Sequence, residues 1–174
     1  FMLHYVLNEL KERGRSFNFG DRTMILTGGG WKAHENERIP EEKFRKDVEE
    51  LLGVRPEHCL DMYGMVEGNG WMLQCPEGHH FHIPTSYLHP MVLDDEGNNL
   101  GFGKYGRFAF LDGSMNAYPG FIVTSDKVRM LEHCPHCDRP GPVLESGITR
   151  MAGKEIRGCG EEMRKMMAND VGGD

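Results

Sequence analysis

The sequence lacks two features that would place the protein at a membrane or on nucleic acid. No segment approaches the roughly 20 apolar residues of a membrane-spanning helix. Basic residues are outnumbered, with 20 lysines and arginines against 27 acids and a net charge of −7, whereas nucleic-acid surfaces are usually basic. The stretch from Phe1 also lacks the basic and apolar regions of a secretory signal. We expect a cytoplasmic protein with no membrane span and no nucleic-acid partner.

The chain also lacks a disulfide framework and a phosphate-binding P-loop. Its five cysteines are an odd number, and two of them form the Cys-x-x-Cys pair Cys134 and Cys137, which suits a reducing compartment. Lys32 directly follows Trp31, so the GxxxxGK spacing of a P-loop is missing. The 174 residues suffice for one compact body, and 23 glycines predict many turns.

The first part of the chain, about residues 1–70, alternates between helical and strand patterns. Apolar residues recur at helical spacing over 3–13, and a compact apolar run at 23–27 predicts a buried strand. A second helix is predicted to begin at Pro40 and to end at Gly53, and a second strand covers 58–63. This order is typical of a partial parallel α/β sheet.

After Gly70 the pattern changes to short apolar runs between turns, which predicts a mostly antiparallel β-sheet or a small barrel over residues 71–160. Residues 161–174 form a charged segment that we expect to be a C-terminal helix and tail. The apolar runs lie at 71–73, 91–93, 108–111, 121–123 and 128–131.

Three polar or glycine-rich loops follow predicted strands. They are Gly28-Gly29-Gly30-Trp31, the Tyr63-Gly64 motif that ends at Glu67, and Thr124-Ser125-Asp126. Because ligands of open α/β sheets bind at the carboxyl ends of strands, these loops could line one cleft.

Each loop suggests a contact with a nucleotide, and each has a plainer interpretation. The glycine triplet would let a flat base lie against the backbone, or it is a turn without a ligand. Tyr63 could stack on a base and Glu67 could hold Mg²⁺ beside phosphates, or they are a core tyrosine and a solvated acid. Asp126 could accept both ribose hydroxyls, or it lies in an ordinary turn.

Cysteines and histidines form a second group with metal-ligand chemistry. Cys75, Cys134, Cys137 and either His82 or His80 would complete a tetrahedral structural zinc site. A redox pair would favour the start of a helix, and two buried thiols are the remaining alternative. Pro135 between the cysteines favours a loop knuckle.

Taken together, these motifs resemble the adenylate-forming superfamily, which includes acyl-CoA synthetases and luciferases. The resemblance covers Leu3 to Gly158 and is strongest to the phenylacetate-CoA ligases and to the acyl-protein synthetases, the long-chain-fatty-acid luciferin-component ligases. It implies the second half of the large N-terminal domain, with Arg150 in the place of a functional arginine. Such enzymes use ATP and Mg²⁺ to convert a carboxylic acid, here a fatty acid, into an acyl-adenylate, and a thiol then takes the acyl group.

The acyl-protein synthetase branch implies that a cysteine near the C-terminus receives the acyl group. Cys159 occupies that place, beside Arg157 and close to Lys154, where positive charge favours the thiolate. The alternative is a packing role. Aryl- or acyl-CoA ligase is a second interpretation of the whole chain.

The superfamily's phosphate loop and its small C-terminal domain find no match in these residues. We therefore expect an incomplete ligase that needs an upstream half, with a reductase-type protein as a further possible partner. A noncatalytic zinc-stabilised binding or assembly module derived from the same fold is the alternative from another class.

Overall fold

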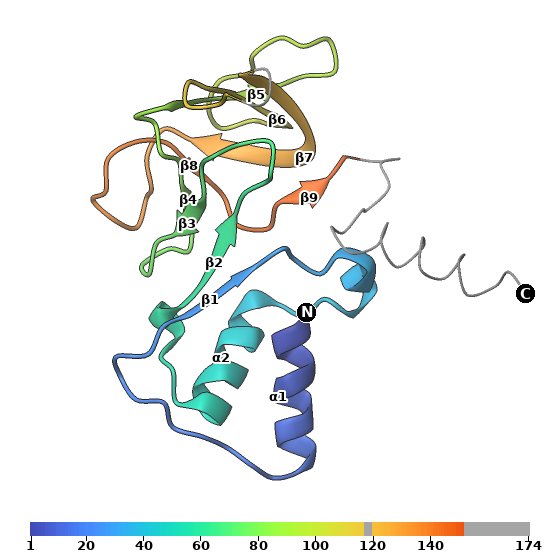
Figure 1. Cartoon of the computed structure of the whole chain (residues 1–174), viewed down its shortest axis with the longest axis vertical. Coiled ribbons are helices and arrows are strands. Elements are labelled where there is room, and N and C mark those ends of the chain that lie inside the picture. The colour runs from blue at the N-terminus through green and yellow to red at the C-terminus, as the bar shows by residue number, and fades with distance from the viewer. Residues whose placement is uncertain (117–119, 152–174) are drawn as a thin grey trace, which may run out of the picture.

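The computed structural model describes residues 1–116 and 120–151. Figure 1 shows two helices packed side by side at one end of the molecule and a stack of antiparallel strands at the other. The described helical segments are α1 (Met2–Glu12), α2 (Glu41–Leu52) and the short 3₁₀ turns Lys32–Glu37 and Pro56–His58. The strands are β1 (Ile25–Gly28), β2 (Cys59–Tyr63), β3 (Met72–Gln74), β4 (Phe81–His82), β5 (Leu88–Leu93), β6 (Tyr105–Asp112), β7 (Phe121–Leu131), β8 (Val143–Leu144) and β9 (Thr149–Arg150).

Helices α1 and α2 form where apolar residues recur every three or four positions. Leu7 of α1 and Val48 of α2 are fully buried in the core that these helices share with Ile25 and Cys59 of the adjoining strands. Gly53 ends α2 in the left-handed conformation at φ 65°. A Cβ there would lie 2.6 Å from Asn18 Oδ1, so this helix end requires glycine.

The strands join in the order β1-β2-β3-β4-β8-β7-β6-β5, and β9 pairs with β7. β1 and β2 are parallel, with Gly28 opposite Met62, while the later pairs are antiparallel. The mixed α/β fold predicted from the sequence is therefore confirmed. The later strands form an open sheet, so the alternative of a small barrel is wrong.

A second hydrophobic core, separate from the one beneath α1 and α2, lies within the β-rich part. Phe108 and Phe110 of β6 are fully buried there, together with Val92 of β5 and Val128 of β7. The runs expected at 121–123 and 128–131 belong to one strand, β7, because the polar residues between them continue the ladder with β9. The sequence pattern missed β4, β8 and β9, which are two residues long.

Two sequence predictions lie outside the described residues, namely Cys159 and the C-terminal segment 161–174. Within the described part of the chain, no helix has the length and apolar character that a membrane crossing requires.

Candidate functional site

The carboxylate of Asp126 joins three segments that are far apart in the sequence. The Tyr63 hydroxyl, at the end of β2, donates to Asp126 Oδ2 at 2.6 Å. The Arg150 side chain, on β9, forms an ion pair with Asp126 Oδ1 through Nε at 3.1 Å. Asp126 itself lies in the middle of β7 and not at a strand end. Three of the predicted site residues therefore meet at one acidic group.

Asp126 is largely buried but keeps acceptor capacity. Its side chain is 13% exposed, and its backbone N–H donates to Thr124 Oγ1, whose hydroxyl donates to the carbonyl of Phe108. Each carboxylate oxygen offers about two acceptor positions, and Tyr63 and Arg150 use one on each oxygen. The remaining positions can accept further O–H donors, such as the vicinal hydroxyls of a ribose.

The ring of Tyr63 packs inside the β-rich core. Its centroid lies 6.1 Å from that of Phe81 and 6.0 Å from that of Phe108. Burial, followed by the negative charge of Asp126, raises the pKa of the Tyr63 hydroxyl, which stays protonated and donating at neutral pH. In this arrangement Tyr63 orients Asp126, and its stacking on a base stays a prediction.

The other residues of the Tyr63 motif lie beside it. Gly64 lies directly against the indole of Trp71. A Cβ at position 64 would lie 2.7 Å from the Trp71 ring, so a side chain would clash there. Glu67 is half-buried in a turn, and its contact with Mg²⁺ stays a prediction. Trp71 is a neighbour of the motif that sequence reasoning did not single out.

The glycine triplet borders a cavity of about 340 Å³. Gly28, Gly29, Gly30 and Trp31 line it together with Asp61 of β2. Thr27 Oγ1 donates to Asp61 Oδ1 at 2.9 Å, while burial raises the pKa of this carboxyl. Tyr63 and Asp126 do not line this cavity. The three predicted loops therefore do not share it.

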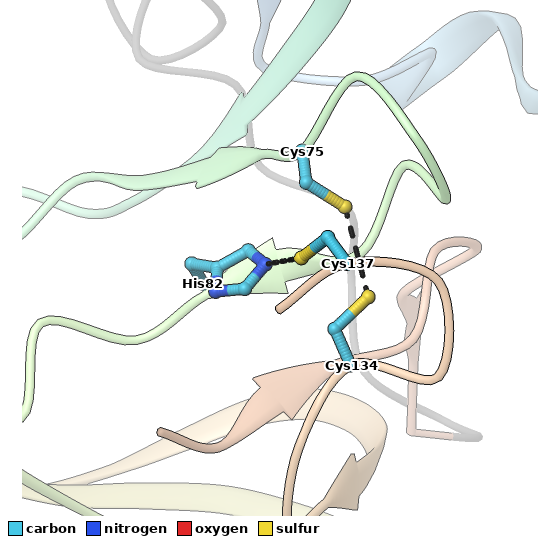
Figure 2. Close-up of side chains that lie close together, drawn as sticks. All are labelled: Cys75, His82, Cys134 and Cys137. Carbon is cyan, nitrogen blue, oxygen red and sulfur yellow. Dashed lines mark hydrogen bonds between the residues drawn. The ribbon is translucent and has the colours of Figure 1, made fainter. Parts of the chain in front are cut away.

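Four side chains converge at a candidate metal site between β3, β4 and the loop after β7 (Figure 2). The ligand atoms of Cys75, His82, Cys134 and Cys137 all lie within 4.8 Å of one another. Cys75 Sγ is 3.8 Å from Cys134 Sγ, and Cys137 Sγ is 3.4 Å from His82 Nε2. A tetrahedral zinc ion with Zn–S bonds of about 2.3 Å holds its sulfur atoms about 3.8 Å apart, so the donor set and spacing fit zinc.

The geometry distinguishes the two candidate histidines. His80 Nδ1 contacts the carbonyl of Gly78 at 2.8 Å, whereas His82 belongs to the cluster. Burial raises the pKa of the Cys134 thiol to about 11, so a bound cation would be needed to hold it as a thiolate.

The two loops of the metal site also contact each other directly. Gly78 lies against His136, since a Cβ on Gly78 would come within 2.6 Å of that side chain. Arg139 donates to both oxygens of Glu77, at 2.6 and 3.1 Å. Sequence reasoning missed this pair, because 62 residues separate its members and neither is part of a motif.

Comparison with solved structures identifies the fold. A long-chain-fatty-acid-CoA ligase (FadD1) from Archaeoglobus fulgidus superposes with a TM-score of 0.55 at 16% identity, over 97% of this chain and 35% of that enzyme. At this identity the likeness shows the fold alone. The described residues therefore have the fold of part of that ligase.

The particular family follows from the sequence match. The model of the acyl-protein synthetase (LuxE) family matches residues 1–168, and the chain belongs to this family. Long-chain-fatty-acid luciferin-component ligases of Aliivibrio fischeri and Vibrio harveyi are 27% and 29% identical over 98% and 94% of this chain. The matches span 45% and 43% of those relatives, so the chain corresponds to less than half of their length. The resemblance predicted from the motifs is confirmed.

Proposed function

We propose that the chain supplies the nucleotide-binding part of an ATP-dependent fatty-acid ligase, in which Asp126 binds the ribose hydroxyls. The observation that carries this proposal is the convergence of Tyr63 and Arg150 on the Asp126 carboxylate. Family membership supports this reaction class, since the two similar luciferin-component ligases bear names that specify a long-chain fatty acid.

Around Asp126 the other predicted contacts take defined roles in this proposal. The loop Gly28–Trp31 follows β1. Because β1 is parallel to β2, this loop lies at the same end of the strands as Tyr63. In this proposal the loop receives the adenine. Glu67 would hold a Mg²⁺ ion, which would offset the negative charge of the phosphates. Arg150 offsets the negative charge that gathers at phosphorus when the fatty-acid carboxylate attacks, or orients the Asp126 carboxylate through their ion pair.

Zinc has a structural role in the same proposal. Three cysteines and one histidine make a closed ligand set with no open position for a substrate. The ion would fix the end of β3 and β4 to the loop after β7, the strand that carries Asp126. It would therefore stabilise the site without taking part in the reaction.

Two further elements of the proposal depend on the whole protein. Cys159 is the proposed acceptor of the acyl group, and an upstream half or a reductase-type protein is the proposed partner. After incubation of the complete enzyme with ATP and radiolabelled fatty acid, label on Cys159 supports the first element, and an unlabelled Cys159 contradicts it.

Calorimetric titration of the chain with AMP tests the central assignment. Asp126→Asn keeps the side-chain shape but loses acceptor positions and charge, so we expect AMP affinity to fall by about tenfold or more. Asp95→Asn is the matched control, because Asp95 is 80% exposed and forms its ion pair with Arg107 and not with a residue that contacts Asp126. Equal affinity of Asp126→Asn and the parent chain would overturn the assignment.

A change in the ligand isolates the ribose contact from any effect on folding. AMP without its 2′ and 3′ hydroxyls should bind the parent chain more weakly than AMP does. The same loss of hydroxyls should change little for Asp126→Asn, which already lacks the contact. If both proteins lose affinity equally, Asp126 does not contact the ribose.

A further inference from the structure

The candidate metal site contains two buried thiols and one that is partly exposed (Figure 2). Cys75 and Cys134 are 2% and 4% exposed, whereas Cys137 is only partly buried. Cys59, the remaining cysteine of the described residues, is 3% exposed and lies in the other core. We therefore expect a small solute to meet Cys137 before any other thiol in residues 1–116 and 120–151.

The guanidinium of Arg139 lies against this accessible sulfur. Both the side chain and the backbone N–H of Arg139 donate to Cys137 Sγ. Arg139 is itself held by two hydrogen bonds to Glu77, at 2.6 and 3.1 Å. A fixed guanidinium can also donate to an oxygen atom that becomes negative as it leaves. The surroundings of Cys137 therefore suit a reaction in which its sulfur displaces an oxygen.

Two further sulfur atoms lie near Cys137. The four ligand atoms of the site are all within 4.8 Å of one another, so this distance also bounds the gaps from Cys137 Sγ to the sulfurs of Cys134 and Cys75. Cys134 is on the same loop, so a disulfide with it needs movement within one loop. A disulfide with Cys75 would also displace the end of β3. An accessible thiol beside a resolving thiol is typical of redox-sensing cysteines.

We propose that Cys137 is a site of oxidation by hydroperoxides and that Cys134 resolves the oxidised sulfur into a disulfide. The Cys137 thiolate attacks one peroxide oxygen, so that an S–O bond forms and the O–O bond breaks. Cys134 then attacks the sulfenic sulfur, so that the S–S bond forms and the S–O bond breaks. Each oxygen that leaves takes a proton from solvent, giving one alcohol or water molecule and one water molecule. The two sulfurs together lose two electrons, which reduce the peroxide.

This disulfide would remove two of the four ligands of the proposed zinc ion. Cys75 and His82 alone do not complete a tetrahedral structural site, so the ion would be released. The loop after β7 would then no longer be linked through metal to β3 and β4. The inference rests on the zinc site of the proposed function and adds a reversible modification that opens it, because thiols reduce accessible disulfides.

Treatment of the 174-residue chain with hydrogen peroxide tests the assignment of the two cysteines. Peptide mass spectrometry should show a disulfide between Cys134 and Cys137, with release of zinc, and dithiothreitol with added zinc should reverse both changes. A disulfide between Cys75 and Cys134 would overturn the proposal. Zinc release while Cys137 stays unmodified, or no reaction under conditions that oxidise glutathione, would overturn it as well.

Two variants separate the reactivity of Cys137 from the number of sulfur ligands. Cys137→His and Cys75→His each give a set of two cysteines and two histidines, which also binds structural zinc. Cys137→His lacks the accessible sulfur and should release zinc about tenfold more slowly in peroxide. Cys75→His keeps Cys134 and Cys137 and should release zinc at nearly the parent rate. Equal rates in the two variants would contradict the proposal.

A third variant keeps all four proposed ligands, so its result does not depend on altered metal binding. Arg139→Gln removes the guanidinium beside Cys137 and should slow the peroxide reaction by about threefold or more. Arg13→Gln is the matched control, because Arg13 also pairs with a glutamate, Glu9, but at the end of α1. Its rate should equal that of the parent chain. A parent rate in Arg139→Gln would overturn the contribution of this side chain.

These measurements do not involve AMP, so failure of the nucleotide assignment is distinguishable from failure of this one. A parent chain that binds no AMP contradicts the proposed function. A parent chain that holds no zinc contradicts the proposed metal site, and the disulfide mapping still decides whether Cys137 and Cys134 react as assigned.

Discussion

The two ends of the molecule differ in how completely they are buried. The β-rich part encloses Phe108 and Phe110, and the four side chains of its candidate metal site connect segments that are distant in sequence. The α/β part has a small core beneath α1 and α2, while Leu26 of β1, the terminal strand of the described sheet, is 49% exposed. The difference indicates that the first part is enclosed by its own strands, whereas the second leaves apolar side chains exposed.

The largest effect should follow loss of a ligand of the proposed zinc ion. Cys134→Ser removes one ligand, and because metal binding couples to folding, we expect the β-rich part to lose on the order of 5 kcal/mol or more of stability. Elemental analysis should show one zinc per parent chain and a much lower content in the variant. Hydrogen exchange should accelerate in β3, β4 and β8 and change little in α1 and α2.

Cys59→Ser is the control for this comparison. Cys59 is equally buried but lies in the α/β core, where a hydroxyl costs about 1 to 3 kcal/mol. The zinc content of the Cys59→Ser variant should equal that of the parent chain. Zinc-free parent protein with unchanged stability would show that the four side chains have no metal-dependent role.

An intermediate effect is expected at the contact between the two parts. Tyr63→Phe deletes the hydroxyl that donates to the buried Asp126, so the free energy of unfolding should fall by about 1.5 to 3 kcal/mol, as for a hydrogen bond to a charged group. Urea denaturation measures the change. Tyr105→Phe removes a similar contact, to Glu145 at 3.1 Å, but at an exposed site, and should cost less than about 1 kcal/mol. Equal costs would indicate that the Tyr63 contact is not important for joining the parts.

The smallest effect concerns the α/β part alone. Lys11 and Lys43 donate to the buried Asp47 at 2.6 and 3.0 Å. Burial opposes ionisation of Asp47, but the two lysines outweigh it and lower its pKa.

The direction of the pH effect follows from that lowered pKa. The unfolded chain releases the Asp47 proton near pH 3.9, and the folded chain does so at lower pH. The contribution is therefore present above about pH 4 and is lost as the pH falls through the folded-state pKa. Because the lysines are partly exposed, we expect about 1 kcal/mol or less. Asp47→Asn should flatten the acid limb of stability against pH, and an unchanged limb would contradict this.

Sequence patterns predicted the elements that bury a regular apolar stripe. α1, α2 and the parallel strands follow from spacing alone. β7 was divided into two runs because Thr124 to Asp126 are polar, and their partners on β9 and at Tyr63 are distant in sequence. The two-residue strands have too few positions to show any period.

The candidate site was predictable to a similar extent. The Cys-x-x-Cys spacing identified Cys134 and Cys137, while the choice of His82 over His80 depended on the β3–β4 turn. The motifs identified Tyr63 and Asp126 as candidate nucleotide-binding residues. That the Tyr63 hydroxyl bonds Asp126 depends on the packing of its ring against Phe81 and Phe108, which no local pattern encodes.

The most direct test of the account asks whether one nucleotide contacts both parts of the molecule. Titration of the ¹⁵N-labelled chain with AMP should shift the amide resonances of Gly28 to Trp31 and of Asp126 and Arg150 along a single binding curve with one Kd. Shifts confined to one of these regions, or two unrelated curves, would contradict a nucleotide site shared between the α/β part and the β-rich part.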